Sequence, residues 1–215
     1  MNARFMASLQ ELLAAHARLL VLDAASARVQ VGWLVRGETP RWFASESEAG
    51  VAVFEGMKSL GRSPEEAGAF VFCEGPGSVL GVRTTAMAVR TWTTLRARPV
   101  FAYQSLALVA DALRRPELTL IADARRDSWH AMKRGGTLRR VATAELSGPL
   151  ATPEHFRNWT PLPADIARVP YSLADLFAQT RDADLFQAST SPDAFLHEEP
   201  SYVTWTPQIH RAPTP

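Results

Sequence analysis

A glycine-rich segment, residues 74–83, has the residue types and spacing in this chain that best suit anion binding. It reads EGPGSVLGVR and lies between an apolar run and a helical pattern. Gly75 and Gly77 allow positive φ angles and close backbone approach, and the first turn of a helix leaves backbone N–H groups without intrahelical acceptors. With Arg83 near the same helix end, one interpretation is a phosphate or carboxylate pocket. The other is a tight strand-to-helix turn, and composition alone does not separate the two.

The segment matches neither standard nucleotide-binding motif. A P-loop needs Gly-Lys-Ser or Gly-Lys-Thr, and a dinucleotide fingerprint needs another spacing than glycines at 75, 77 and 81. Ser78 stands outside a Gly-x-Ser-x-Gly frame, and the five histidines contain no His-x-x-x-His pair. The single cysteine, Cys73, ends an apolar run, which favours a buried packing role. Since no Cys/His cluster has metal-ligand spacing, the sequence predicts no metal site and no cofactor.

Two aspartates and an arginine cluster are the remaining polar candidates. Asp23 and Asp123 each end an apolar run, where an aspartate can hold a cation or cap nearby backbone N–H groups. The basic cluster consists of Arg125-Arg126, Arg139-Arg140 across a predicted hairpin, and Lys133-Arg134 beside its turn. It either contacts nucleic-acid phosphates within a larger assembly or is a solvated hairpin face. The net charge of +1, from 23 Lys and Arg against 22 Asp and Glu, gives no overall electrostatic case for nucleic acid.

These residues need a framework of strands and helices, which the hydrophobic pattern predicts. The predicted strands are 19–23, 29–35, 39–44, 69–73, 99–103, 118–123, 128–133 and 138–144. The predicted helices are 46–60, ended by Gly61, then 79–95, 105–114 with Ser105 as N-cap, 153–158 and 173–181. The first three strands form a meander. Because the strand-then-aspartate element recurs at Asp123, a second sheet is expected to begin as the first does.

The two ends of the chain differ from this framework. Residues 1–17 carry Phe5, Leu9, Leu12 and Leu13 at helical spacing, which predicts an amphipathic helix packed on the body or on a partner rather than a secretion signal. From Gly148 onward the chain holds ten of the fifteen prolines and one of the twelve glycines, so this part is expected to be largely irregular. No apolar run reaches the roughly 18–20 residues of a membrane helix, and the sequence predicts a soluble, cytoplasmic protein.

The glycine segment also resembles the GPGSFTGxR signature of the TsaB (YeaZ) family, which follows a buried strand and opens a long helix. The matching residues are Gly75-Pro76-Gly77-Ser78 and Gly81-Val82-Arg83. Three further segments agree in order and spacing. Residues 21–25 resemble the family's first strand, 121–125 its D-A-R element, and 200–203 its P-x-Y-L/V ending.

The resemblance implies an α/β, duplicated actin-like ATPase (ribonuclease H-like) fold, in which two lobes each hold a mixed sheet flanked by helices. It is clear over about residues 19–144 and rests on position and length over 148–199. The implied domains are an extra N-terminal helix (1–17), a first lobe (18–104), and a smaller second lobe (105–215) with a proline-rich, irregular end. The repeated strand-then-aspartate element is expected from such a duplication.

The resemblance also implies a function. TsaB proteins are similar to the catalytic subunit TsaD but have lost its metal and nucleotide site, and they act by binding that subunit in a complex with the TsaE ATPase. The complex moves threonylcarbamoyl to the adenosine beside the anticodon of tRNA. The implied role is a non-catalytic scaffold and activator that meets tRNA only through the complex. The residues expected to face tRNA are Arg125, Arg126, Arg139 and Arg140.

The predicted partner interface is the signature loop with the helix that follows it. Its residues are Gly75, Pro76, Gly77, Ser78, Gly81, Val82, Arg83, Ala86 and Val89. Val82, Ala86 and Val89 form a stripe with Trp92, and periodicity does not tell an interface stripe from a core stripe. An apolar interface without its partner is expected to pair with itself, which predicts a homodimer of the isolated chain.

Departures from the family pattern leave alternatives open. The Phe-Thr of the signature is Val79-Leu80 here, and Ser47-Glu48 replace the His-Ser/Thr pair expected near the first helix. The loops after Asp23 and Asp123 lack the glycines with which an actin-like ATPase approaches phosphate, so ATP hydrolysis is not expected. The alternatives are an enzyme of the same superfamily with a modified nucleotide or metal site, ATPase or glycopeptidase-like, and a diverged paralogue that binds another partner.

Overall fold

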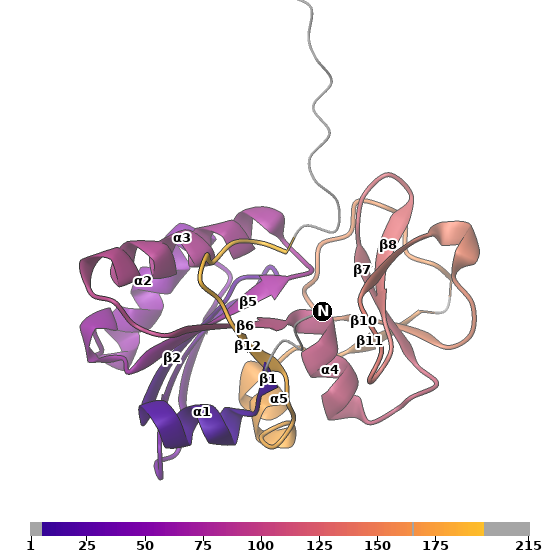
Figure 1. The fold of residues 1–215 in the computed structure, drawn as a ribbon. Helices are drawn as coiled ribbons and strands as arrows, with labels where there is room; N and C mark the ends of the chain where they lie inside the picture. The colour runs from indigo at the N-terminus through magenta and orange to yellow at the C-terminus, as the bar shows by residue number, and fades with distance from the viewer. Residues whose placement is uncertain (1–5, 165, 196–215) are drawn as a thin grey trace, which may run out of the picture.

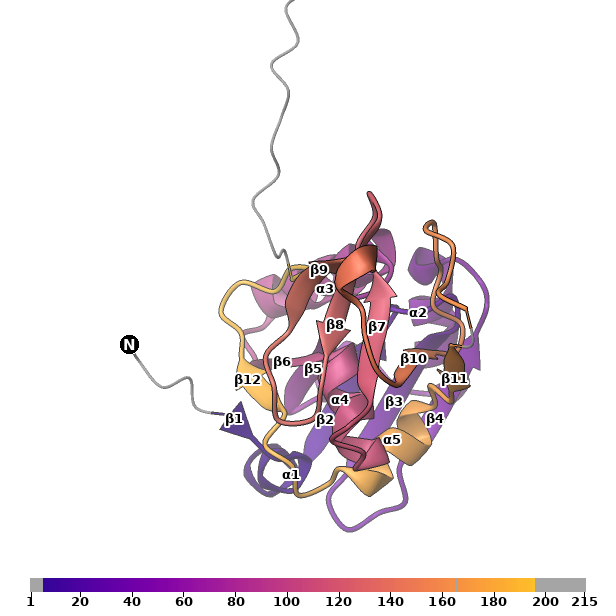
Figure 2. The ribbon, with the colours of Figure 1, turned by 90° about the vertical axis from the view of Figure 1, so that its right-hand side faces the viewer.

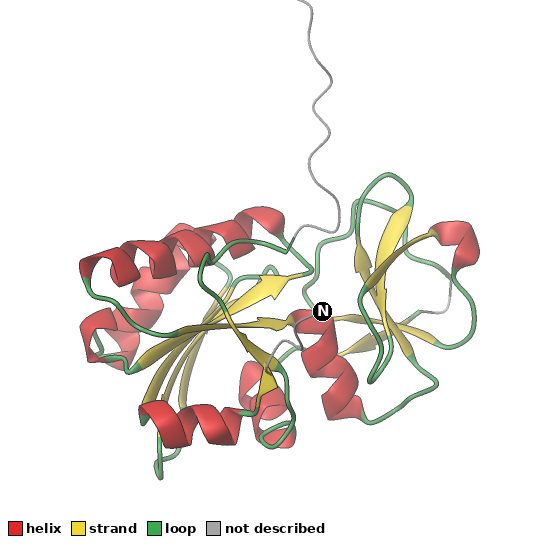
Figure 3. Ribbon diagram, in the orientation of Figure 1, coloured by secondary structure: helices red, strands yellow, loops and turns green. Residues whose placement is uncertain are grey.

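The computed structural model describes residues 6–164 and 166–195, which form two mixed β-sheets flanked by helices (Figure 1) (Figure 3). The first sheet has the strand order β1 (Met6–Ala7), β12 (Phe186–Ala188), β6 (Val100–Gln104), β5 (Ala69–Gly75), β2 (Arg18–Asp23), β3 (Val29–Val35) and β4 (Arg41–Ser45). The second has the order β11 (Ala167–Val169), β10 (Leu150–Pro153), β7 (Thr119–Asp123), β8 (Ser128–Met132) and β9 (Arg139–Ala142). The helices are α1 (Leu9–His16), α2 (Ala49–Leu60), α3 (Val79–Leu95), α4 (Ser105–Leu113) and α5 (Leu173–Gln179), with 3-10 turns at Pro64–Glu66 and Thr143–Glu145.

The first sheet begins with the predicted meander. β2, β3 and β4 pair antiparallel, with Val21 opposite Gly32 and Gly32 opposite Trp42. β5 pairs parallel with β2 and β6 parallel with β5, and α2 and α3 make the crossovers that parallel strands require. Gly61 ends α2 in the left-handed conformation, with a φ of 61°, as the sequence predicts.

Alternation along the central strands divides the first lobe into two cores. Leu20 and Leu22 face α2 and α3, whereas Leu19 and Val21 point to the opposite side of the sheet, where α1, α4 and α5 contribute. Figure 1 shows α2 and α3 over one face of this sheet and α1 and α5 below the other. Because both faces are covered, the central strands are continuous apolar runs rather than alternating ones.

The second sheet repeats the opening of the first. β7, β8 and β9 pair antiparallel, and β10 and β11 add to β7 as parallel strands. β7 ends at Asp123 as β2 ends at Asp23, so the recurrence predicted from the sequence is confirmed. Ile121, Trp129 and Ala131 form a small core on one face of this sheet, which lies in front of the first sheet in Figure 2.

The chain returns to the first lobe after the second sheet. β12 pairs with β6, β1 pairs with β12, and α5 packs Phe177 against Trp42 and Tyr103. One hydrophobic core therefore contains residues of both sheets, among them Val71 and Leu120. The predicted boundary after residue 104 separates the strands of the two sheets except for β12, and as a domain boundary it stays a prediction.

The N-terminal helix is shorter than the predicted 1–17 segment. Met6–Ala7 form β1, and α1 begins only at Leu9 because Ser8 and Glu11 make a capping box. The Ser8 hydroxyl accepts from the Glu11 N–H (3.2 Å), and the Ser8 N–H donates to the Glu11 carboxylate (2.8 Å). Leu9, Leu12 and Leu13 are buried as predicted. Phe5 and the segment 200–203 lie outside the described residues.

Two other local predictions are wrong. The helix predicted at 153–158 is absent, because β10 continues to Pro153 and a turn follows, whose His155 carbonyl accepts from the Ala27 N–H (2.7 Å). Ser105 is the first residue of α4 rather than its N-cap, and its hydroxyl instead donates to the Pro76 carbonyl (2.6 Å). Within the described ranges, α1 to α5 include no segment with the length and apolar character to cross a membrane.

Candidate functional site

The glycine segment is a tight loop between β5 and α3, as the sequence predicts. Gly75 and Gly77 have φ angles of 108° and 152°, which residues with a side chain rarely adopt. Ser78 caps α3, because its hydroxyl accepts a hydrogen bond from the Gly81 N–H (3.3 Å). The Ser78 N–H donates to the Ala25 carbonyl (2.8 Å). The loop is therefore tied both to its own helix and to the turn after β2.

Close packing against that turn accounts for two of the glycines. A Cβ at Gly77 would collide with the carbonyl oxygen of Ala25, and a Cβ at Gly81 with that of Ala24. The two glycines let the start of α3 lie directly on the backbone of the β2–β3 turn. The interpretation as a strand-to-helix turn therefore explains Gly77 and Gly81 without any ligand.

The predicted apolar stripe of α3 faces inward. Val82, Ala86 and Val89 are at most 1% exposed and belong to the two cores of the first lobe. Trp92 is half-buried beside them, with its ring centroid 5.7 Å from that of Phe70. Periodicity left open whether this stripe is an interface or part of the core. Its burial fits the core, and these side chains do not lie on the surface where a partner would meet them.

The rest of the predicted interface is also mostly enclosed. Gly75, Pro76 and Gly81 are buried, and Gly77 and Ser78 are half-buried. Arg83 alone among the nine predicted residues is exposed. Its Nε lies 3.7 Å from Oδ1 of Asp193, a weak surface ion pair. The predicted interface residues thus position α3 rather than form its outer face.

The outer face of α3 and of its neighbour α2 is apolar. Six of the seven large apolar side chains that are exposed among the described residues lie on these two helices. We call them the α2–α3 surface: Val51, Phe54, Val79, Leu80, Met87 and Leu95. Leu80 is 79% and Phe54 63% exposed, and the two helices pack side by side (Figure 1). A concentration of this kind is typical of an interaction surface.

The threonines on α3 keep their hydroxyl groups within the helix. Thr84 donates to the Leu80 carbonyl and Thr91 to the Met87 carbonyl, both at 2.9 Å. Because these donors are satisfied four residues back along the helix, no hydroxyl needs water or a partner as acceptor. The helix therefore suits close packing by an apolar partner.

Asp23, one of the two candidate cation ligands, is sealed in the core. Its Oδ2 accepts hydrogen bonds from the hydroxyls of Tyr103 (2.5 Å) and Tyr171 (2.6 Å), and its Oδ1 from the Ala25 N–H (2.9 Å). Complete burial raises the pKa of Asp23 above its ordinary value, although these hydrogen bonds act in the opposite direction. Asp23 therefore caps a backbone N–H group of the turn after β2, which was one of its two interpretations from the sequence. Cys73 is buried next to this cluster, as predicted, and burial raises the pKa of its thiol.

Asp123 caps backbone in the second lobe. Its Oδ1 accepts from the Arg125 N–H (2.5 Å), and its Oδ2 from the N–H groups of Trp159 (2.5 Å) and Thr160 (2.6 Å). One carboxylate thus joins the β7–β8 turn to a distant segment of the chain. Residues 6–164 and 166–195 contain no group of three or more His, Cys, Asp or Glu side chains that could hold a metal ion.

The predicted basic cluster is divided. Arg125 and Arg126 are exposed in the β7–β8 turn, whereas Arg139 and Arg140 point to opposite faces of β9. Arg140 supports the turn, since it donates to the Ser128 hydroxyl (2.9 Å) and to the Ala124 carbonyl (3.2 Å). Arg134 pairs with Asp111 (2.9 Å). That the cluster faces tRNA stays a prediction.

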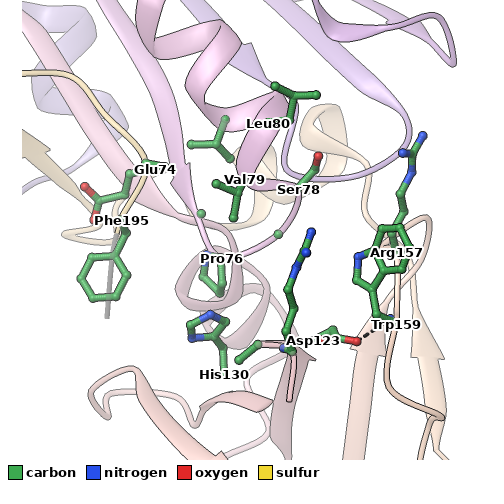
Figure 4. A pocket seen from close by; sticks show the side chains of 16 residues that line it. Glu74, Pro76, Ser78, Val79, Leu80, Asp123, His130, Arg157, Trp159 and Phe195 are labelled. Carbon is green, nitrogen blue, oxygen red and sulfur yellow. Dashed lines mark hydrogen bonds between the residues drawn. The ribbon is translucent and has the colours of Figure 1, made fainter. Parts of the chain in front are cut away.

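A cleft of about 280 Å³ brings the glycine loop and the end of β7 together (Figure 4). It is lined by the first turn of α3, by Asp123 to Arg125, by His130, and by Arg157 and Trp159. Trp159 is 71% exposed. The two segments that sequence analysis singled out therefore meet at one site, together with two side chains that it did not single out.

Sequence reasoning missed Phe54, Tyr171, Arg157 and Trp159. A signal existed for Phe54, because it lies off the buried helical face of α2 that carries Val53, Met57 and Leu60. The other three lie in the irregular part of the chain, where no periodicity predicts which side chains meet.

Comparisons with known proteins find one matching family model and similar solved structures. The family model for TsaD, the tRNA N6-adenosine threonylcarbamoyltransferase, matches residues 44–149. Among solved structures, YeaZ from Pseudomonas aeruginosa is similar with a TM-score of 0.54 and 21% identity, over 75% of this chain and 90% of that one. A structure described as an uncharacterized protein with similarity to peptidase YeaZ from Pseudomonas aeruginosa has a TM-score of 0.53 and 20% identity, over 76% and 89%. No curated protein matches the chain.

At this level of identity the structural likeness shows the fold. Two mixed sheets, each opened by an antiparallel meander and flanked by helices, form the actin-like ATPase type of fold found in YeaZ. The family match covers α2, the glycine loop and α3, and continues through β9. The exposed apolar surface, the loop and the β7–β8 turn all lie within that span.

Proposed function

We propose that this TsaB/YeaZ-like chain is a non-catalytic subunit that binds a TsaD-type catalytic subunit in the synthesis of threonylcarbamoyladenosine in tRNA. The observation that carries the proposal is the α2–α3 surface, which holds six of the seven exposed large apolar side chains among the described residues. A catalytic site would need open polar groups, whereas this face offers apolar area. The subunit acts as scaffold and activator, and a TsaE-like ATPase and tRNA join through the complex.

The chemistry of the surface fits a helical partner. Leu80 and Met87 follow each other along α3 at a spacing of two turns, and Phe54 lies on the adjoining α2. Exposed charges flank this apolar strip, with Glu55 and Lys58 on α2 and Arg90 on α3. An apolar centre with a polar rim is the usual anatomy of a protein–protein interface. Large apolar anchors in such a centre carry most of the binding energy.

The two strand-ending aspartates support a role without catalysis. Asp23 is enclosed by Tyr103 and Tyr171, and Asp123 already accepts three backbone N–H groups. Carboxylates in these positions are engaged in holding the fold. Ala24 and Ala25 are buried against the glycine loop, where their carbonyl oxygens occupy the space next to Gly81 and Gly77.

Co-purification with the TsaD-like protein of the same genome tests the proposal. Leu80→Glu and Phe54→Glu each place a charge on the α2–α3 surface, at its most exposed position near the start of α3 and its most exposed position within α2, and are expected to weaken the complex about tenfold or more. Both side chains are exposed, so neither change affects the core. The matched control is Thr137→Glu, which adds the same charge at an exposed site near the β8–β9 turn and is expected to leave binding unchanged.

The native chain must bind for the proposal to stand. If it retains no TsaD-like protein, or if Thr137→Glu weakens the complex as much as Leu80→Glu does, the proposed role is wrong and a diverged paralogue with another partner becomes the better interpretation.

Light scattering of the isolated chain tests whether the α2–α3 surface pairs with itself. The uncovered surface is expected to form a homodimer that Leu80→Glu converts to a monomer.

A further inference from the structure

Two arginines and an exposed tryptophan line one end of the cleft between the lobes. The guanidinium carbon of Arg125 lies 5.2 Å from the ring centroid of Trp159, and Arg157 lines the same cleft (Figure 4). All three side chains are exposed. Arg125 lies over one face of the ring, but Trp159 is 71% exposed, so aromatic surface and two positive charges stay open to a ligand.

A single carboxylate positions two of these residues. Asp123 accepts the backbone N–H of Arg125 at Oδ1 and the backbone N–H of Trp159 at Oδ2, both at 2.5 Å. Since Arg125 and Trp159 are 34 positions apart in the chain, this carboxylate is what brings their backbones to one place. The backbone positions of both residues are therefore fixed without a ligand.

The turn that carries Arg125 is held in an unusual conformation. Arg125, Arg126 and Asp127 have φ angles of 62°, 52° and 53°, the left-handed region that residues other than glycine seldom adopt. The Ser128 hydroxyl donates to the Arg125 carbonyl (2.6 Å), and Arg140 donates to that same hydroxyl (2.9 Å). A conformation of this kind persists only where the surrounding structure fixes it, and such positions gather at binding sites.

The charges at this end of the cleft are not neutralised within the described part of the chain. Neither Arg125 nor Arg157 forms an ion pair there. Asp123, one of the two carboxylates that line the cleft, is already engaged by three backbone N–H groups. Glu74, the other carboxylate of the cleft, accepts from the side-chain amides of Gln104 (3.3 Å) and Gln187 (3.0 Å), and Figure 4 shows it at the far end from Trp159.

We propose that this cleft binds one nucleotide unit, with the base stacked on Trp159 and the phosphate between Arg125 and Arg157. Aromatic side chains stack on any base, and arginines bind phosphate through paired N–H groups. The volume of about 280 Å³ is near the lower end of the range of small-molecule sites and suits a single unit. The unit is either a free mononucleotide or one residue of a single-stranded RNA. The site needs no protein partner, so it goes beyond the proposed function.

Calorimetric titration of the full isolated chain tests the site with three probes: AMP, a single-stranded oligoribonucleotide and inorganic phosphate. Trp159→Ala is expected to weaken nucleotide binding by about tenfold or more, and Trp159→Phe by less, because a phenyl ring still stacks. Arg125→Gln and Arg157→Gln are each expected to weaken it and to lower the slope of log affinity against log salt for the oligonucleotide by about 0.7. Far-UV circular dichroism checks that each variant is folded.

Arg168→Gln is the matched control, since it removes an exposed positive charge of the second lobe that lies in β11, outside the cleft and outside the predicted basic cluster. It is expected to leave binding unchanged. If AMP and the oligonucleotide both bind, and the variants weaken both equally, the ligand is a free nucleotide. If the oligonucleotide alone binds, the ligand is RNA. Either result supports the proposed site. The proposed site is overturned if no probe binds, if phosphate binds as tightly as AMP, or if Arg168→Gln loses as much binding as Arg125→Gln does. Neither result depends on whether a TsaD-like protein co-purifies.

Discussion

The side chain of Asp23 is surrounded by hydrogen-bond donors and not by water. It is fully buried, with two tyrosine hydroxyls on one oxygen and a backbone N–H on the other. Burial disfavours the charged carboxylate, and donors favour it. Here the burial is the larger effect, so the pKa of Asp23 is raised, and the residue stabilises the fold more when it carries its proton.

Asp23→Asn is expected to remove a pH-dependent part of the stability. Because the folded state holds the Asp23 proton more tightly, the unfolded chain releases that proton first as the pH rises above about 4. The free energy of unfolding of the native chain therefore falls, relative to that of Asp23→Asn, from about pH 4 towards neutrality. Urea denaturation of both proteins across this range measures the difference. A difference that does not change with pH would show that the pKa of Asp23 is not raised.

Gly81→Ala is expected to destabilise the protein by about 1–3 kcal/mol, because the new Cβ would collide with the Ala24 carbonyl and push α3 away from the β2–β3 turn. Gly50→Ala is the matched control. Gly50 lies in α2 with nothing within 4 Å of the added atom, so alanine there is expected to stabilise the helix by up to about 1 kcal/mol. Equal midpoints of urea denaturation for Gly81→Ala and the native chain would contradict the packing role of this glycine.

Among the elements, α3 shows both what the sequence predicts and what it leaves undecided. Its bounds, Val79–Leu95, are those predicted, because a glycine loop precedes it and its apolar spacing is regular. Its outward face was not predictable. Leu80 and Met87 are as apolar as Val82 and Val89, so periodicity does not tell the exposed stripe from the buried one.

Long-range contacts explain the other omissions at the candidate site. The hydroxyl of Tyr171 bonds to Asp23 across 148 positions of the chain, and the Trp159 N–H bonds to Asp123 across 36. Both residues lie in the proline-rich part, where no repeating pattern marks a buried face. The strands β2 to β9 and the helix α2 were predictable because apolar runs, alternation and helical spacing specify them, whereas β1, β10, β11 and β12 were not predicted. The irregular segment takes its structure from residues that only the fold brings near.

Because α5 packs on the first lobe, Phe177→Ala is expected to lower the stability of the protein strongly. This side chain is 3% exposed and packs its ring against those of Trp42, Tyr103 and Phe186. Its removal is expected to destabilise the protein by about 3–5 kcal/mol in urea denaturation. Phe54→Ala removes the same ring from an exposed position of α2 and is expected to change stability by less than about 0.5 kcal/mol. If both variants lose the same stability, α5 is not part of the core.

In the molecule as a whole, the two lobes are joined through a common core. One cluster of buried side chains includes Val71 of β5, Leu120 of β7 and Leu173 of α5. The amide of Gln30 in β3 also donates to the Tyr171 carbonyl (3.0 Å) and its oxygen accepts from the Leu173 N–H (2.9 Å). Opening the cleft by a movement of one lobe against the other would disrupt this common core, whereas the Gln30 hydrogen bonds hold α5 on the first lobe. The two lobes are therefore expected to keep a fixed arrangement around the cleft.

A shared core predicts that the two lobes unfold together. Trp33 is 2% exposed in the first lobe and Trp129 is 0% exposed in the second. Two variants that keep only Trp33 or only Trp129 of the six tryptophans, with phenylalanine at the other five positions, therefore each report on one lobe. Both variants are expected to show one transition, with the fluorescence midpoint coinciding with that of far-UV circular dichroism. Two independent lobes would instead give separate midpoints in the two variants. Such a result would mean that α5 and β12 close the first lobe without coupling it to the second.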